Sequence, residues 1–357
     1  MVKLSINKPI TICIFLLLSM SILIIYSSSM QLAIQQIFFA LAGLLIYFTI
    51  SRIGYISFAN FVRLAYITIL FLLILVFILG VETRGVIRWI PLGFINIQPS
   101  EFAKPVIILF LAHFWSTNIR SWANILKSIL WVSPVGFLVF KQPDLGTTIT
   151  IFAIWLGMLF ACGLELKKII ILSLLIFMMM PLTWFVIADY QKQRITSFLW
   201  PNQDPLGVGY NIIQSTIAVG SGQLLGRGLG QGTQSRLQFL PEYRTDFIFA
   251  AISEELGLLG ALMILCIFFF LIVYGLRAAQ MAADYPGYMI AIGVSIMILF
   301  QTLINVGMNI GILPITGVTL PLISYGGSSL IATLICLGLL ASVANMRKRV
   351  DILTVGM

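Results

Sequence analysis

The stretch Phe247–Leu276, FIFAAISEELGLLGALMILCIFFFLIVYGL, decides the fold class. Its last 21 residues carry no charge, and about 20 apolar residues are what an α-helix needs to cross the hydrocarbon core of a bilayer. The rest of the chain has the same character. Of its 357 residues, 60% are hydrophobic and 9% are charged, whereas soluble domains have about 25% charged residues. A soluble globular protein is therefore excluded, and the sequence predicts an all-α integral membrane protein.

Ten apolar ranges of this kind occur along the chain, and we predict that each is a transmembrane helix. They are 9–26, 33–51, 63–80, 101–116, 124–140, 146–163, 169–187, 247–276, 287–312 and 322–346. The fourth and fifth ranges are short for a span, so a hairpin that does not fully cross stays open as an alternative. We expect one polytopic membrane domain over residues 1–357, with no appended soluble domain.

Basic residues are distributed unevenly between the two sides that these spans define. Twelve of the 21 Lys and Arg residues fall on the side of the two termini, which nets +9, whereas the other side nets zero. Since positively charged loops stay in the cytoplasm, both termini are predicted to be cytoplasmic. The first apolar range lacks a small-residue cleavage pattern, so it is predicted to be an anchor and not a removed signal peptide.

The longest predicted loop lies on the extracytoplasmic side, between the seventh and eighth spans, from about Ala188 to Arg244. Its glycines gather between positions 207 and 232. A dinucleotide-binding loop would need a cytoplasmic βαβ unit around it, so that interpretation is rejected. We expect tight turns and close backbone approach to the membrane surface or to a ligand, because long loops in compact folds are usually functional.

A single histidine and four isolated cysteines limit the possible chemistry. His113 lies inside an apolar span, which excludes His-based nucleophile triads and multi-His metal sites. Each cysteine is alone in an apolar run, so neither a disulfide framework nor a metal-binding pair is indicated. The remaining candidates are carboxylates and cations at the outer helix ends, where an unpaired charge near hydrocarbon is costly. They include Arg84, Arg88, Glu101, Lys104, Asp144, Arg194, Glu242, Arg244 and Asp246.

The segment Gln98–Pro105 predicts a helix whose first turn contains Pro99 and whose one face carries Glu101 and Lys104. One interpretation is an ion pair within the helix. The other is a lysine directed toward a lipid-linked phosphate, with Glu101 setting its position. The spacing favours neither.

Two aspartates precede predicted spans. For Asp144 a helix N-cap is the favoured interpretation. That interpretation is weaker for Asp246, because Thr245 can cap equally well and because Asp246, Ser253 and Glu254 can share one polar stripe, which in a membrane helix usually faces a cavity. Apolar neighbours raise the pKa of Asp246, while a helix N-terminus and Arg244 lower it, and the sequence leaves that balance open. An ionised, partly desolvated carboxylate at this position would be a competent general base for a sugar hydroxyl.

Eight segments, in order along the chain, resemble the SEDS family of bacterial cell-wall proteins (shape, elongation, division and sporulation). They are Arg84–Gly93 (RGVIRWIPLG), Gln98–Lys104 (QPSEFAK), Lys141–Thr148 (KQPDLGTT), Asp189–Arg194 (DYQKQR), Asp204–Ser215 (DPLGVGYNIIQS), Gly232–Leu240 (GTQSRLQFL), Pro241–Ala250 (PEYRTDFIFA) and Leu320–Ser329 (LPLISYGGSS). DYQKQR and GTQS favour the rod-shape branch. Two positions depart from the family: Arg244 is often histidine there, and Gln238 is often glutamate.

This resemblance implies ten membrane helices and a peptidoglycan glycosyltransferase that polymerises lipid II on the outer face of the bacterial cytoplasmic membrane during elongation. It implies that Asp246 is the essential aspartate and Asp144 a cavity aspartate. It also implies a class B penicillin-binding protein as partner, docked along spans 247–276 and 287–312, together with other membrane proteins of the elongation complex. No nucleic acid partner is expected.

The mechanism that we predict has Asp246 remove the proton from the acceptor's C4 hydroxyl, with lipid diphosphate as leaving group and inversion at the anomeric carbon. The candidate substrate-binding residues are Arg84, Arg88, Glu101, Lys104, Asp144, Glu242, Arg244 and Ser324. Their cations would neutralise the diphosphate. A divalent cation could share that task, although no ligand cluster requires one. A lipid II transporter and a non-catalytic scaffold for a penicillin-binding protein are the alternatives. Transport is disfavoured because the outer charges lie at helix ends and no inverted repeat is evident.

Overall fold

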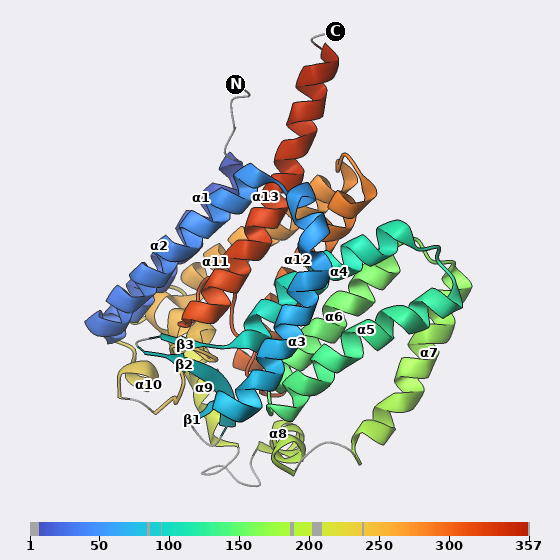
Figure 1. Cartoon of the computed structure of the whole chain (residues 1–357). Helices are drawn as coiled ribbons and strands as arrows, with labels where there is room; N and C mark the ends of the chain where they lie inside the picture. Colours follow the sequence, from blue (N-terminus) through green and yellow to red (C-terminus); the bar gives the residue numbers. More distant parts are fainter. Residues whose placement is uncertain are drawn as a thin grey trace.

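The computed structural model describes residues 7–83, 86–93, 95–185, 189–201, 209–237 and 239–355, which are almost entirely helical. The long helices lie side by side in one bundle, with the start of α1 and the end of α13 at one end and the short elements that follow α7 at the other (Figure 1). The helices are α1 (Lys8–Ser28), α2 (Met30–Ile53), η1 (Tyr55–Phe61), α3 (Val62–Leu79), α4 (Pro99–Thr117), α5 (Trp122–Lys141), α6 (Leu145–Ala161), α7 (Leu166–Thr183), α8 (Asp189–Leu199), α9 (Tyr210–Ser221), α10 (Thr233–Arg236), α11 (Ile248–Gln280), α12 (Tyr285–Asn309) and α13 (Gly327–Val355).

Within the described ranges, seven helices are long and apolar enough to cross a membrane: α1, α2, η1 with α3, α5, α11, α12 and the 327–346 part of α13. The chain is therefore a multi-pass membrane protein. Each of the ten ranges predicted from the sequence coincides with a helix. Helices α4, α6 and α7 are outside the set of seven, and α6 is an apolar helix of only 17 residues. The predicted total of ten crossings thus stays a prediction.

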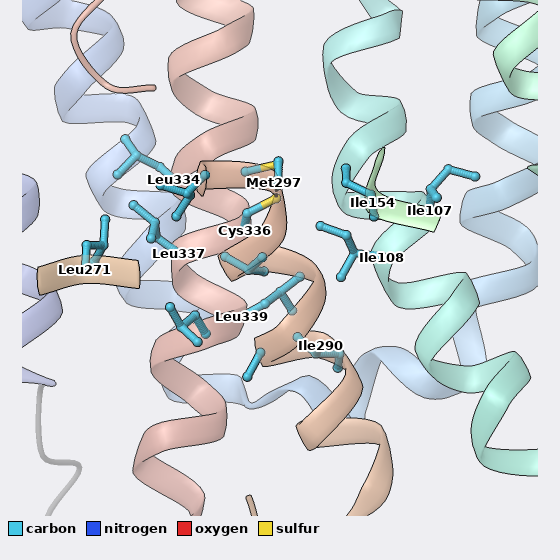
Figure 2. Packing of buried hydrophobic residues seen from close by; sticks show 14 of the residues in the cluster. Ile107, Ile108, Ile154, Leu271, Ile290, Met297, Leu334, Cys336, Leu337 and Leu339 are labelled. Carbon is cyan, nitrogen blue, oxygen red and sulfur yellow. Dashed lines mark hydrogen bonds between the residues drawn. The ribbon is translucent and has the colours of Figure 1, made fainter. Parts of the chain in front are cut away.

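Helix α12 is the centre of the bundle. Figure 2 shows its Ile290 and Met297 between Ile108 of α4 on one side and Leu339 of α13 on the other. Small residues let the helices approach closely, as is typical where lipid supplies no hydrophobic drive for helix association. At Gly293 of α12, an added Cβ would lie 2.8 Å from the sulfur of Met158 and 2.9 Å from Ile108 Cγ2. Large apolar side chains on the outer helix faces are exposed, as expected of surfaces that contact lipid.

A small antiparallel sheet, which the all-α prediction missed, lies between α3 and α4. It consists of β1 (Val81–Thr83), β2 (Val86–Leu92) and β3 (Ile95–Ile97) in the order β1-β2-β3. Ile90 of β2 pairs with Ile97 of β3. Two of the strands have only three residues, too short for an alternating pattern to be recognised. Strand β2, which carries Arg88, lies at the end of the bundle opposite the start of α1 (Figure 1).

Helix α11 is interrupted at Gly257, whose φ is 67° and ψ is −166°. A break of this kind leaves carbonyl and N–H groups of the helix without partners, which is costly in a membrane. Residues 222–230, here called the glycine segment, supply those partners. Arg227 N and Gly228 N donate to the carbonyls of Glu254 and Glu255 at 2.9 and 3.0 Å, and Leu258 N and Leu259 N donate to the carbonyls of Gln223 and Leu224 at 2.9 and 3.3 Å.

Glycines are required because the two backbones nearly touch. A Cβ at Gly222 would lie 1.8 Å from the carbonyl oxygen of Ser253, and one at Gly226, where φ is 80°, would lie 2.2 Å from that of Glu255. The predicted close backbone approach is therefore present, but the approached surface is α11 itself. The predicted loop 188–244 also contains helices α8, α9 and α10. Its residues 202–208, with Gly207, lie outside the described residues.

Candidate functional site

Asp246 lies in the turn just before α11 and is half-buried. It does not cap the helix: the N-cap position is Phe247, whose side chain makes no capping hydrogen bond. Its carboxylate accepts no hydrogen bond from any residue that the structure describes. A Cβ at Gly317 would lie 3.6 Å from Asp246 Oδ2, so the segment after α12 passes beside this carboxylate. The carboxylate is thus free to accept a proton from a substrate.

The surroundings of Asp246 raise its pKa from 3.8 to about 6. Burial is the main cause, and the negative charges of Glu242 and Asp144 act in the same direction. Arg194 and Arg88 oppose the shift. The balance that the sequence left open is therefore decided by burial. A carboxylate with this pKa is ionised at neutral pH and is still basic enough to take up a proton during a reaction.

Asp144 is the N-cap of α6, as the sequence favoured. Its Oδ1 accepts a hydrogen bond from Thr147 N at 3.2 Å. Its Oδ2 accepts two more, from Gln98 Nε2 at 2.9 Å and Ser100 Oγ at 3.1 Å. The start of α6 packs on the segment after α12, because a Cβ at Gly146 would lie 2.9 Å from the carbonyl oxygen of Thr316. Asp144 and Asp246 therefore flank the same segment.

Arg88 joins this group from the sheet. Its Nε donates to the carbonyl of Gln142 at 3.0 Å and its Nη2 donates to that of Pro143, while Nη1 lies 4.0 Å from Asp144 Oδ1. The guanidinium is held at the turn between α5 and α6, with 21% of the side chain exposed. Arg84, the other predicted cation of this strand pair, lies outside the described residues.

Glu101 and Lys104 form an ion pair within the helix, which was one of the two interpretations of their spacing. Lys104 Nζ lies 2.6 Å from Glu101 Oε2, and the two side chains are only 1% and 7% exposed. The helix begins at Pro99, as predicted. Because the ammonium group is buried against its own helix, contact between Lys104 and a phosphate stays a prediction.

Arg244 is directed toward α1. Its Nε donates to Ser28 Oγ at 2.9 Å and its Nη2 donates to the carbonyl of Ser28 at 3.4 Å, while the guanidinium stacks on the Tyr243 ring at 4.7 Å. The sequence placed this charge beside Asp246 as the group that lowers its pKa. That expectation needs correction, since the positive charges that act most on Asp246 are Arg194 and Arg88.

Glu242 and Ser324 shape the turn that carries Asp246. Glu242 has a φ of 54°, and its carboxylate accepts a hydrogen bond from Thr245 Oγ1 at 2.9 Å. Ser324 Oγ donates to the carbonyl of Thr245 at 2.7 Å and accepts from Leu320 N at 2.8 Å. Glu242 and Ser324 therefore stabilise this turn. Contact of either residue with substrate stays a prediction.

Of the predicted polar stripe of Asp246, Ser253 and Glu254, only Ser253 lines a cavity, an apolar one between α9, α11 and α12. Ser253 Oγ donates to the carbonyl of Phe249, and Glu254 is fully buried. The Glu254 carboxylate accepts hydrogen bonds from Gln234 N at 2.8 Å and Ser235 N at 3.1 Å. Glu254 thus fixes the start of α10 and does not face the cavity, because its partner segment lies about 20 residues earlier in the chain.

Two residues that the sequence analysis missed touch the site directly. Asn305 and Asn309 of α12 each donate from Nδ2 to the backbone carbonyl of Asp246 at 3.0 Å. Their spacing of four residues in an apolar span was an available signal, because polar side chains in membrane helices face protein or a cavity. As for metals, no group of three His, Cys, Asp or Glu side chains among the described residues is arranged to hold an ion.

These features define a class: a multi-pass membrane protein with a half-buried carboxylate and two guanidinium groups that act on it at one end of the helix bundle. The chain belongs to the FtsW/RodA/SpoVE family of cell cycle proteins, whose profile matches residues 6–349. This is the SEDS family, so the resemblance drawn from the eight segments is confirmed.

Curated relatives match almost the full length. The chain is 39% identical over 355 residues to the peptidoglycan glycosyltransferase MrdB of Escherichia coli (strain K12), covering 97% of this chain and 95% of the relative. It is 39% identical over 367 residues to stage V sporulation protein E of Bacillus subtilis (strain 168), covering 97% and 99%.

Solved structures share the fold. The rod shape determining protein RodA of Thermus thermophilus superposes with a TM-score of 0.74 at 26% identity, covering 97% of this chain and 98% of that one. A chain from a study of polymerization and crosslinking by a peptidoglycan synthase complex superposes with a TM-score of 0.83 at 28% identity, covering 96% and 98%.

Proposed function

We propose that this chain polymerises lipid II into glycan strands at the outer end of its helix bundle, with Asp246 as general base. The enzyme class follows from homology: the chain is a peptidoglycan glycosyltransferase of the FtsW/RodA/SpoVE family. The observation that carries the mechanism is the carboxylate of Asp246, which accepts no hydrogen bond from the described residues and has a pKa of about 6.

In this mechanism Asp246 takes the proton from the C4 hydroxyl of the acceptor's terminal sugar. The oxygen attacks the anomeric carbon of the donor, a new glycosidic bond forms, and the bond to the lipid diphosphate breaks with inversion. The proton on Asp246 then passes to water. A positioned base of this kind typically contributes about 10²–10⁴ in rate.

Arg88 and Arg194 are our candidates for neutralising the leaving diphosphate. Both lie close enough to Asp246 to lower its pKa, and Arg88 is held rigidly by two backbone carbonyls. Guanidinium groups bind phosphates with a fixed geometry and gain strength in a site that excludes water. No step is assigned to a divalent cation, since the described residues offer no group of three metal ligands.

We infer a location in the bacterial cytoplasmic membrane, with ten crossings, one membrane domain over residues 1–357 and cytoplasmic termini. Ten helices that match the apolar ranges support this topology. The excess of basic residues on the side of the termini supports the orientation. The site of Asp246 is then extracytoplasmic, where lipid-linked donors are used.

We also infer a class B penicillin-binding protein as partner, docked along α11 and α12 in an elongation complex. The similarity to a chain of a peptidoglycan synthase complex supports this inference. An apolar cavity of about 430 Å³ lies between α9, α11 and α12, with Leu262 and Val306 among its lining residues. A single membrane helix with large side chains would fit such a surface.

One experiment in detergent distinguishes an enzyme from a transporter and from a scaffold. Purified full-length protein is incubated with labelled lipid II, alone and with its cognate penicillin-binding protein, in detergent, where transport has no meaning. Glycan polymer supports the proposal. Absence of polymer in both samples, with lipid II still bound, would favour a transporter or a scaffold.

A further inference from the structure

One side-chain amide replaces a backbone hydrogen bond at the start of α11. In a continuous α-helix the carbonyl of residue 246 would accept a hydrogen bond from the N–H of residue 250. Here Asn309 Nδ2 donates to the carbonyl of Asp246 at 3.0 Å, and Ala250 N donates to Asn309 Oδ1 at 3.0 Å. The amide of Asn309 is therefore inserted between the two backbone groups and holds the turn of Asp246 open.

Asn305 ties the same carbonyl to the opposite side of the site. Its Nδ2 donates to the carbonyl of Asp246 at 3.0 Å and to that of Val318 at 2.7 Å. Val318 follows Gly317, which lies against the carboxylate of Asp246. Asn305 thus sets the distance between the backbone of Asp246 and the segment that faces its carboxylate.

The two asparagines form one fully buried unit. Both are 0% exposed, and Asn309 Nδ2 also donates to the carbonyl of Asn305 at 2.7 Å. The carbonyl of Asn309 accepts a hydrogen bond from Ser215 Oγ of α9 at 2.8 Å. Both Asn309 amide atoms have partners, which is the condition under which a buried polar group fixes one conformation.

We propose that Asn305 and Asn309 are positioning residues for Asp246, which hold its backbone open so that the carboxylate faces the acceptor hydroxyl. This inference rests on the proposed role of Asp246 as general base. Without Asn309, the N–H of residue 250 can bond directly to the carbonyl of residue 246, so the turn closes and the carboxylate moves. A displacement of about 1 Å at a catalytic group can cost 10²-fold in rate.

The first test compares Asn309→Ala and Asn305→Ala with Asn345→Ala as the matched control. Asn345 is also buried on a membrane helix and donates to Ser51 Oγ at 3.2 Å. It lies in the second half of α13, whereas the segment that faces Asp246 precedes the first residue of α13. Polymerisation of labelled lipid II by the full-length protein is measured in detergent, with thermal unfolding as the control for folding. We expect kcat to fall at least about tenfold in both site variants, with KM changed less than twofold, and Asn345→Ala to keep both constants.

A second variant keeps the test decisive if truncation prevents folding. Asn309→Asp keeps the size of the side chain and an acceptor for Ala250 N, but it replaces the donor to Asp246 with a negative charge. A like charge disfavours ionisation, so the acid limb of the pH–rate profile is expected to move upward by about one unit. The corresponding Asn345→Asp change would leave the limb in place.

The inference fails if Asn309→Ala polymerises at the normal rate, if Asn309→Asp leaves the acid limb unmoved, or if activity falls only in proportion to folded protein. Its failure is distinguishable from that of the proposed function. An inactive Asp246→Asn variant beside a fully active Asn309→Ala variant would overturn the positioning role alone. An active Asp246→Asn variant would overturn the function on which it rests.

Discussion

At the scale of single residues, two aspartates placed alike in the sequence have different environments. Asp144 caps α6 and accepts three hydrogen bonds, whereas Asp246 leaves its carboxylate without a donor among the described residues. The difference lies in the backbone. Asn309 of α12 binds both the carbonyl of Asp246 and the N–H of Ala250, which would otherwise bond to each other within α11. Asp144 is thus suited to hold structure and Asp246 to exchange a proton.

The pH dependence of polymerisation follows from the pKa of Asp246, which is raised from 3.8 to about 6. The base must be ionised to act, so activity is present above this pKa and is lost as the pH falls through it. We expect kcat/KM to be level near pH 8 and to fall about tenfold per pH unit well below 6. Rates that stay constant down to pH 5 would exclude Asp246 as the titrating base.

Arg88→Lys tests the guanidinium group. Lysine keeps the charge but cannot bond to the carbonyls of Gln142 and Pro143 in the same fork-like geometry. We expect polymerisation to fall about tenfold or more, whereas Arg88→Ala should also shift the acid limb upward, because a charge that lowers the pKa of Asp246 is lost. Arg227→Lys, at an exposed arginine bonded to Thr233, is the control. Equal rates for the Arg88→Lys variant and the unmodified protein would contradict a role in binding diphosphate.

At the scale of elements, the sequence predicted the position of ten helices well and their internal geometry poorly. Uncharged apolar runs of about 20 residues allow little besides a membrane helix. The break at Gly257 was missed because a glycine in an apolar run is compatible with a straight helix, and the segment that pairs with the break lies about 30 residues earlier in the chain. The role of Asn309 was missed for the same reason, since it depends on how α12 packs on α11.

Gly226→Ala tests the pairing of the glycine segment with α11. A Cβ at this position would lie 2.2 Å from a backbone oxygen, and φ is 80°, so the variant should lose about 1–3 kcal/mol of stability. The matched control is Gly220→Ala in α9, where a Cβ meets nothing within 4 Å. Thermal unfolding in detergent should show a lower Tm for Gly226→Ala only. Equal Tm values for the two variants would mean that the segment is not tightly paired in solution.

At the scale of the whole molecule, charge and hydropathy determined the membrane class, and motifs determined the family. Neither the composition nor the motifs could predict which charged side chains lie close together in the fold. Asp144, Arg88, Arg194 and Asp246 come from four parts of the chain and act on one another only because the segment after α12 brings them together. Arg244, only two residues before Asp246 in the same motif, contacts α1 instead.

The apolar cavity beside α11 and α12 gives a test of the proposed partner surface. Leu262→Trp adds bulk where Leu262 lines the cavity, and Phe38→Trp enlarges an exposed side chain of α2. Co-purification with the cognate penicillin-binding protein should be weakened by Leu262→Trp and unaffected by Phe38→Trp. Equal recovery of the partner with both variants would place the docking surface elsewhere.

The central claim concerns one carboxylate, and substitution by its amide addresses it most directly. Asp246→Asn keeps the shape of the side chain and removes the base, while Asp189→Asn changes an aspartate that is 94% exposed on α8. In the detergent assay with labelled lipid II, Asp246→Asn should lose about 10²–10⁴ in rate while binding lipid II and unfolding at the normal temperature, and Asp189→Asn should polymerise normally. Normal glycan synthesis by the folded Asp246→Asn protein would contradict the account.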